Sequence, residues 1–231
     1  MALSAIGGKK DMKIIRNLTT LALVVAGISL STPAFALTCG GGTLFTQLAG
    51  AIPDAGFQTD AAQACVTFSG NTMTIVLENN TAAITNVPHT LVGFSMDLAA
   101  GGGINLTGVS VPSGFIDCYS NFQKGGKGPC IQKATFTDEQ GGQVVGSPYT
   151  WDEATGSAQV GSGCTNQTFG VGIFAGDTPG CFSLHPGGIA GTFANTTGPN
   201  DGPHNDMLLG EVTFTLNCTT ACSGASNGRF Y

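Results

Sequence analysis

The sequence predicts an all-β fold: a single antiparallel β-sandwich, jelly-roll-like or Ig-like, with long glycine-rich loops and disulfides. Several segments alternate apolar and polar residues with the two-residue period of a strand. Glycine-rich stretches separate these segments at roughly the 8–12-residue spacing of sandwich strands. The chain of 231 residues contains 36 glycines, which suit such loops, and eight cysteines, which suit the disulfides.

The N-terminus has the pattern of a secretory signal peptide. A basic segment precedes an apolar stretch, Leu18 to Leu30, and Ala34-Phe35-Ala36 follows as a small-x-small cleavage site. The apolar stretch is too short for a membrane-spanning helix. We therefore expect residues 1–36 to be removed, leaving residues 37–231 as one domain with no transmembrane segment.

The charge balance limits the possible partners. Residues 1–36 contain four of the eight basic residues and one of the fourteen acidic residues, so their removal takes the formal net charge from −6 to −9. A nucleic-acid-binding protein needs a basic surface, so this class is excluded. The expected location is extracellular or at the cell surface.

The cysteines predict four disulfides, because an even number in an exported protein is typical of a disulfide framework. Local pairing is the simplest expectation: Cys118 with Cys130, and Cys164 with Cys181. The other four residues pair either as neighbours or between the two ends of the domain. They are Cys39, Cys65, Cys218 and Cys222.

Three segments carry the clearest strand pattern: 72–78, 91–98 and 210–217. Alternation places one set of their side chains in the core and the other set toward solvent. The residues expected on the core face of the second and third segments are Phe94, Met96, Leu98, Val212, Phe214 and Leu216.

Other local patterns are less regular. Leu44 to Ala51 is expected as a short helix, with Thr43 as its cap and Pro53 beyond its end. The segment 170–175 fits a relaxed dinucleotide-binding motif, but its alternating Val, Ile and Phe favour a strand. The segment 224–228 fits G-x-S-x-G; too few residues follow it to supply an acid and a histidine, so we expect a polar tail.

Two groups of residues are candidates for binding. Tyr149 and Trp151 share a face of an extended segment and, with Asp152 and Glu153, form a possible sugar-stacking platform. The alternative is a tryptophan buried in the core. Asp201 and Asp206 flank a tight Gly-Pro turn whose oxygen atoms suit Ca²⁺, although Asp and Gly are also ordinary turn residues.

The order of three segments resembles the extracellular β domains of bacterial exosortase-sorted (PEP-CTERM-type) surface proteins. They are TIVLENNT at 74–81, LVGFSMDL at 91–98 and GEVTFTL at 210–216. The resemblance covers about residues 65–217. It implies an exported surface or matrix protein without known catalysis, and it transfers no site residue. That family ends in a Pro-Glu-Pro sorting tail, whereas this sequence ends SGASNGRFY, so sorting by that route is not expected.

The sequence therefore predicts a secreted bacterial surface or extracellular-matrix structural protein without enzymatic activity. Exposed strand edges would allow it to associate with itself or with matrix components. The first alternative is a carbohydrate-binding module that uses the Trp151 platform. The second alternative is a secreted hydrolase, for which the adjacent pairs Asp138-Glu139 and Asp152-Glu153 supply carboxylates. Neighbouring strand residues point to opposite faces, so neither pair forms an active site alone.

Overall fold

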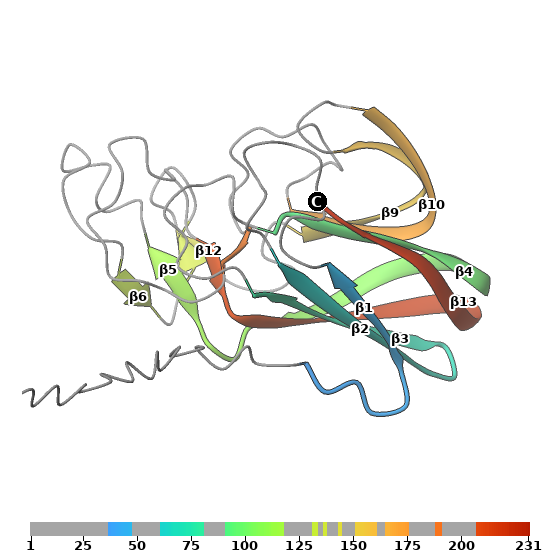
Figure 1. Ribbon diagram of the computed structural model, residues 1–231, viewed down its shortest axis with the longest axis horizontal. Coiled ribbons are helices and arrows are strands. Elements are labelled where there is room, and N and C mark those ends of the chain that lie inside the picture. Colours follow the sequence, from blue (N-terminus) through green and yellow to red (C-terminus); the bar gives the residue numbers. More distant parts are fainter. Residues whose placement is uncertain are drawn as a thin grey trace, which may run out of the picture. The chain divides into compact units, whose positions relative to one another are not determined.

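In the computed structural model, the regular elements of the described residues are all strands, which confirms the all-β prediction (Figure 1). The described residues are 37–47, 61–80, 91–117, 131–133, 136–137, 143–144, 151–160, 165–175, 188–190 and 207–231. The strands are β1 (Thr43–Gln47), β2 (Ala62–Ser69), β3 (Thr72–Asn79), β4 (Gly93–Ser110), β5 (Phe115–Asp117), β6 (Ile131–Lys133), β7 (Phe136–Thr137), β8 (Gln143–Val144), β9 (Trp151–Val160), β10 (Thr165–Ala175), β11 (Ile189–Ala190), β12 (Met207–Leu209) and β13 (Glu211–Phe230).

The main feature is a seven-stranded antiparallel sheet with the order β1-β2-β3-β13-β4-β10-β9. Strand β13 lies between β3 and β4, although β3 and β4 are consecutive in the sequence. A second sheet has the order β11-β12-β5-β6, and β7 and β8 form a separate pair. Two edges of the large sheet are therefore strands β1 and β9.

The large sheet is strongly curved. The rings of Phe45 in β1 and Phe94 in β4 are 5.5 Å apart, although four strand spacings separate β1 from β4. In a flat sheet these spacings would amount to about 19 Å. Trp151 in β9 likewise contacts Phe214 in β13 at 4.7 Å, across three strand spacings. The apolar core consequently lies on the concave side of this sheet.

The long strands β4 and β13 contain a corner, which we define as residues 101–103 and 218–222. Gly101 and Gly103 have φ values of 147° and 51°, which only glycine adopts readily. A Cβ at Gly103 would lie 2.6 Å from the side chain of Thr219, and the Thr219 hydroxyl donates to the Gly102 carbonyl at 2.7 Å. The register of β13 against β4 shifts between Thr220 and Ser223. These features let the β4–β13 pair bend around the core.

The core confirms most of the predicted strand faces. Five of the six predicted residues are buried and the sixth, Leu98, is partly buried against them. Ser95 departs from the alternation, because it is buried on the face expected to be polar. Its hydroxyl oxygen lies 3.1 Å from that of Tyr231, so the last residue of the chain covers this part of the face. The five buried residues are Phe94, Met96, Val212, Phe214 and Leu216.

The predicted helix over Leu44 to Ala51 is wrong for residues 44–47, which belong to strand β1. Pairing with β2 places Phe45 opposite Ala64, on the core side of the sheet. The helix cues are local, and the pairing with β2 outweighs them. Residues 48–51 lie outside the described residues. Segment 170–175 lies in β10, as the strand interpretation predicts.

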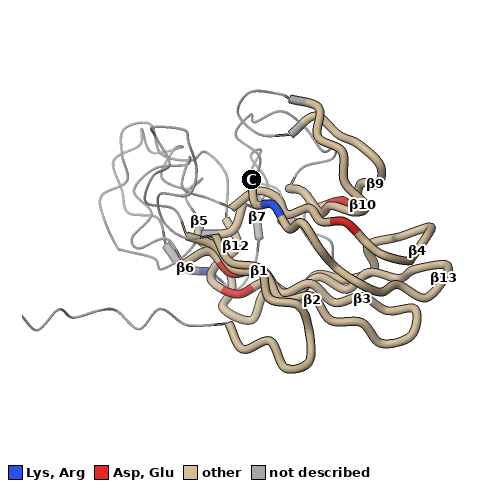
Figure 2. The backbone as a smooth tube through the Cα atoms, turned by 45° about the vertical axis from the view of Figure 1, so that its right-hand side comes forward, with Lys and Arg blue, Asp and Glu red and all other residues tan. Residues whose placement is uncertain are grey.

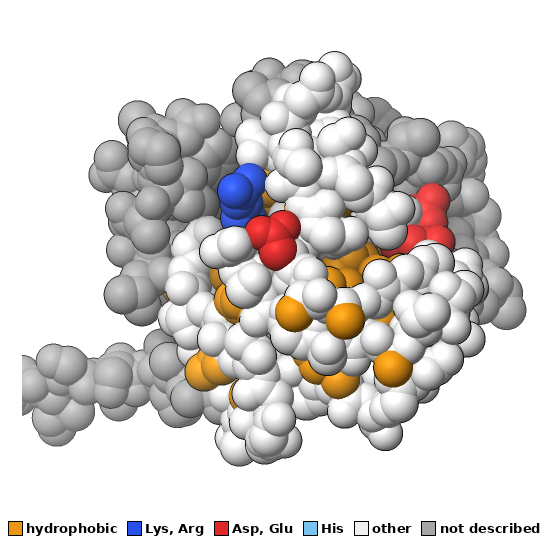
Figure 3. Space-filling model, turned by 90° about the vertical axis from the view of Figure 1, so that its right-hand side faces the viewer, with side chains coloured by type: hydrophobic (Ala, Val, Ile, Leu, Met, Phe, Trp, Pro, Cys, Tyr) orange, Lys and Arg blue, Asp and Glu red, His pale blue; other side chains and the backbone are white. Residues whose placement is uncertain are grey.

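The surface of the described residues offers few charges and little apolar area. Figure 2 shows acidic and basic residues at only a few places along the strands. In the view of Figure 3, apolar side chains appear mostly as small separate areas. Among the described residues, the large hydrophobic side chain left exposed is Leu44, at 46 % exposure.

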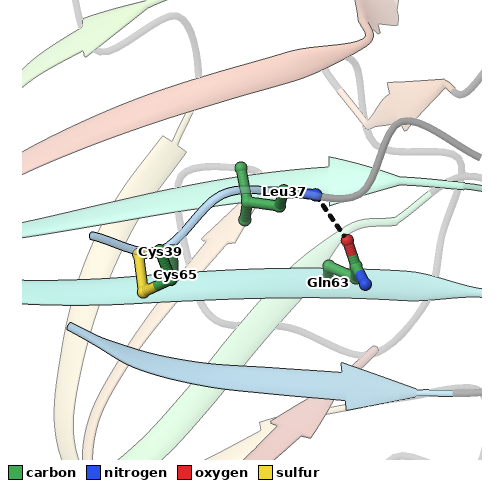
Figure 4. The surroundings of a disulfide bond; sticks show 4 residues. All are labelled: Leu37, Cys39, Gln63 and Cys65. Atoms are coloured by element: carbon green, nitrogen blue, oxygen red, sulfur yellow. Dashed lines mark hydrogen bonds between the residues drawn. A yellow bond between two sulfur atoms is a disulfide. The ribbon is translucent and has the colours of Figure 1, made fainter. Parts of the chain in front are cut away.

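Two disulfides are described, and both join cysteines close in sequence. Cys39, before β1, pairs with Cys65 in β2, and beside this bond the Leu37 amide donates to the Gln63 side chain at 2.9 Å (Figure 4). Cys218 pairs with Cys222 within the corner. Of the two predicted alternatives for these four residues, the structure has the neighbouring pairs. Such bonds indicate an oxidising environment.

The two pairings predicted for the other cysteines cannot be followed in the structure. Cys118, Cys130, Cys164 and Cys181 lie outside the described residues. The bonds Cys118–Cys130 and Cys164–Cys181 therefore stay predictions.

Candidate functional site

Trp151, the centre of the predicted sugar platform, begins strand β9 and is a core residue. Its side chain is 1 % exposed, and its ring packs on Phe214 at a centroid distance of 4.7 Å. Stacking on a sugar needs an open ring face, which this packing does not leave. We therefore assign Trp151 to the core, the alternative use of a tryptophan in a β domain.

The two acidic residues that follow Trp151 are both partly buried, and each carboxylate accepts a hydrogen bond from a backbone amide. The Asp152 carboxylate accepts a bond from the Glu153 amide at 2.9 Å. The Glu153 carboxylate accepts a bond from the Leu106 amide of β4 at 3.0 Å. Glu153 thus satisfies a backbone donor of another strand, which is a structural role.

The remaining predicted binding residues cannot be placed. Tyr149, Asp201 and Asp206 lie outside the described residues, as does the pair Asp138-Glu139. No group of three His, Cys, Asp or Glu side chains suited to a metal ion occurs within the described ranges. The calcium site at Asp201 and Asp206 stays a prediction.

Strand β9 forms an edge of the large sheet and contains a run of exposed residues. It pairs with β10 on one side and, within the described part of the chain, has no strand on the other. Its ten residues, WDEATGSAQV, include neither lysine nor proline. Residues 155–157 are exposed. Lysine and proline are common protections against edge-to-edge pairing, and strand β9 contains neither.

A polar network lies on the outer side of β4, β10 and β13, where sequence reasoning did not expect one. The Asp97 carboxylate accepts bonds from the Asn227 side chain at 2.8 Å and the Gly170 amide at 3.2 Å. Arg229 donates to the Gln167 side chain at 2.9 Å. In the view of Figure 3, one basic and one acidic side chain lie side by side. These groups satisfy one another, which stabilises strand pairing near the chain end.

The G-x-S-x-G segment 224–228 lies within strand β13, next to this network. Ser226 is the register partner of Asp97 on β4. A nucleophile of this kind requires a turn from a strand to a helix, whereas Ala225 and Ser226 pair with β4 and the same strand resumes its pairing at Arg229.

A second unexpected cluster consists of two glutamates on adjacent strands. Glu78 of β3 and Glu211 of β13 are direct register partners. The Glu78 side chain is 8 % exposed. The Asn80 side-chain amide is oriented with its nitrogen toward the Glu78 carboxylate. This nitrogen donates to the two Glu78 oxygens at 3.2 and 3.3 Å. Burial and, secondly, the charge of Glu211 raise the pKa of Glu78, and the Asn80 bond opposes them in part.

This pair predicts that stability decreases as the pH rises through the raised pKa of Glu78. A carboxyl with a higher pKa in the folded state binds its proton more tightly there, so its contribution is complete below the unfolded pKa and lost above the folded one. Glu78→Gln should remove this dependence and stabilise the protein at pH 7 by about 0.2–1 kcal/mol, the range of cross-strand pair effects.

Urea denaturation of the wild type and Glu78→Gln between pH 4 and 8 tests this effect. Glu211→Gln is the matched control, because it removes the like charge but leaves Glu78 buried. It should move the transition in stability to lower pH without abolishing it. A pH dependence that is the same in Glu78→Gln and wild type would contradict the assignment.

Comparisons with known protein families, curated proteins and solved structures find no match to this chain. Within the described ranges there is no helix with the length and apolar character needed to cross a bilayer.

Proposed function

We propose that this protein is a secreted bacterial surface or extracellular-matrix structural protein that associates through edge strand β9, at its exposed central residues. The observation that carries the proposal is the ten-residue edge without lysine or proline, whose central residues 155–157 are exposed. An unpaired strand edge presents a row of backbone donors and acceptors to another chain.

The character of the described surface supports association through backbone groups. Its exposed apolar side chains are few, so a large hydrophobic interface is not favoured on these residues. The two disulfides suit a protein that functions outside the cell. The resemblance to exosortase-sorted surface proteins favours the same class.

We also propose that the curved sheet and the smaller sheet together form a variant of a β-sandwich.

The alternatives have less support. The burial of Trp151 takes one of the two rings of the predicted sugar platform into the core. The hydrolase hypothesis uses the Glu153 carboxylate for catalysis, but this carboxylate accepts a structural hydrogen bond from the Leu106 amide. The edge therefore supports a structural role better than either alternative.

Thr155→Lys tests this function, because an exposed lysine on an edge strand opposes pairing. We expect the wild-type mature protein to self-associate with rising concentration in sedimentation velocity experiments. Thr155→Lys should raise the dissociation constant at least tenfold, or about 1.4 kcal/mol.

The matched control is Thr46→Lys, which places the same change at an exposed position of the other edge strand, β1. It should leave association unchanged. A wild-type protein that is monomeric at every concentration would contradict the proposed function, as would equal effects of the two lysine variants.

A further inference from the structure

We propose that removal of the signal peptide supplies a counter-charge to the glutamate pair Glu78 and Glu211, namely the α-ammonium group of Leu37. Hydrolysis of the peptide bond between Ala36 and Leu37 adds water across it. Ala36 keeps a carboxylate, and the Leu37 nitrogen changes from a neutral amide to an ammonium. The expected cleavage site therefore determines where a new positive charge arises. This inference concerns maturation and does not rest on association through β9.

Strand β2 holds the Leu37 nitrogen in place. This nitrogen donates to the Gln63 side-chain oxygen at 2.9 Å, in a partly buried position. Two residues further along each segment, Cys39 is bonded to Cys65, and Figure 4 shows the two contacts side by side. After cleavage the ammonium group still has a donor for Gln63, and hydrogen bonds from charged donors are about twice as strong as those from neutral ones.

Gln63 is the direct neighbour of the glutamate pair. It is the register partner of Glu78 on β3, and Glu78 is in turn the partner of Glu211 on β13. Directly opposed side chains share a face of the sheet, with Cβ atoms about 4.5–5.5 Å apart. Ala64 and Leu77, which adjoin this row along their strands, belong to the core, so the row lies on the opposite face. The residue that holds the ammonium is thus one strand spacing from Glu78.

The charge of Glu78 is costly without a positive partner. Burial and, secondly, the charge of Glu211 raise its pKa. The basic side chains of the described residues are Lys133 and Arg229, and neither of them is among the causes of this shift. A positive charge nearby favours the charged form of a carboxyl group.

The distance between neighbouring strands is short enough for this attraction to act. One strand spacing is about 4.8 Å, which is less than the screening length of about 8 Å at physiological ionic strength. In the precursor the Leu37 nitrogen is a neutral amide, so the two glutamates lack this counter-charge. Maturation therefore makes the folded protein more stable than its precursor.

N-terminal sequencing and acetylation test the inference. The secreted protein should begin at Leu37, and a different first residue overturns the inference. Selective acetylation of the α-amino group then removes the charge but retains an N–H donor for Gln63. In urea at pH 7 we expect acetylation to increase the unfolding equilibrium constant about threefold, within the range for opposite-charge cross-strand pairs. The effect should decrease in about 1 M salt, where the screening length is about 3 Å.

Glu78→Gln shows whether the glutamate is the partner of the ammonium. In this variant acetylation should leave the unfolding equilibrium constant unchanged, so Glu78→Gln stabilises the acetylated protein more than the unmodified one. The matched control is Asp152→Asn, which removes a carboxylate from a partly buried position of β9 and should keep the full effect of acetylation.

If Glu78→Gln does not fold, Glu211→Gln takes its place and should reduce the effect of acetylation. Wild-type protein that is unaffected by acetylation overturns the inference, as does an equal effect in wild type and the glutamate variant. Neither outcome bears on association through β9, which is measured separately.

Discussion

Replacing Phe214 by alanine is expected to lower the free energy of unfolding by about 3–5 kcal/mol, the range for a fully buried aromatic residue. The Phe214 side chain is 0 % exposed and packs on Trp151 from the far edge strand of the same sheet. Its loss leaves a cavity between β13 and β9 that a curved, hydrogen-bonded sheet fills poorly.

Denaturation in guanidinium chloride at constant pH measures this effect as a shift of the midpoint. Asn217→Ala is the matched control, because Asn217 lies on the same strand but is exposed. It should change stability by no more than about 0.5 kcal/mol. A Phe214→Ala protein as stable as Asn217→Ala would show that the core is not where the structure places it.

Removing the Cys39–Cys65 disulfide by a double alanine substitution is expected to cost about 3–4 kcal/mol. A cross-link restricts the unfolded chain more when it closes a longer loop, and these residues are 26 positions apart. The bond also ties the segment before β1 to β2, beside the Leu37–Gln63 hydrogen bond (Figure 4).

The Cys218–Cys222 bond provides the comparison, because it spans four positions only. The same chain-entropy relation gives about 2 kcal/mol for its removal. Unfolding midpoints of the two double variants should therefore rank the Cys39–Cys65 protein as the less stable one. The reverse order would mean that the corner depends on its disulfide for more than chain entropy.

The strands with regular alternation could be predicted because their pattern is local. Phe94, Val212 and Phe214 each follow the two-residue period, and the structure buries all three. Residues 44–47 could not be placed in the same way. Their threonine cap and the later proline suggested a helix, whereas their strand depends on pairing with β2.

The candidate site depended on contacts between distant residues, which no local pattern reports. Whether Trp151 stacks on a ligand or fills the core is decided by Phe214. The bond between Asp97 and Asn227 joins residues 130 positions apart. The edge character of β9 likewise follows from strand order.

The position of β13 has a consequence for how the chain reaches its folded state. This strand is the last of the described elements, and it joins β1-β2-β3 to β4-β10-β9. Until residues 211–230 are available, these two groups of strands lack their common neighbour and the core between them stays open to water. Completion of the sheet is therefore a late, non-local event, and folds dominated by such pairings form in milliseconds to seconds rather than microseconds. A chain that emerges from its N-terminus therefore contains both groups of strands before it contains the strand that joins them.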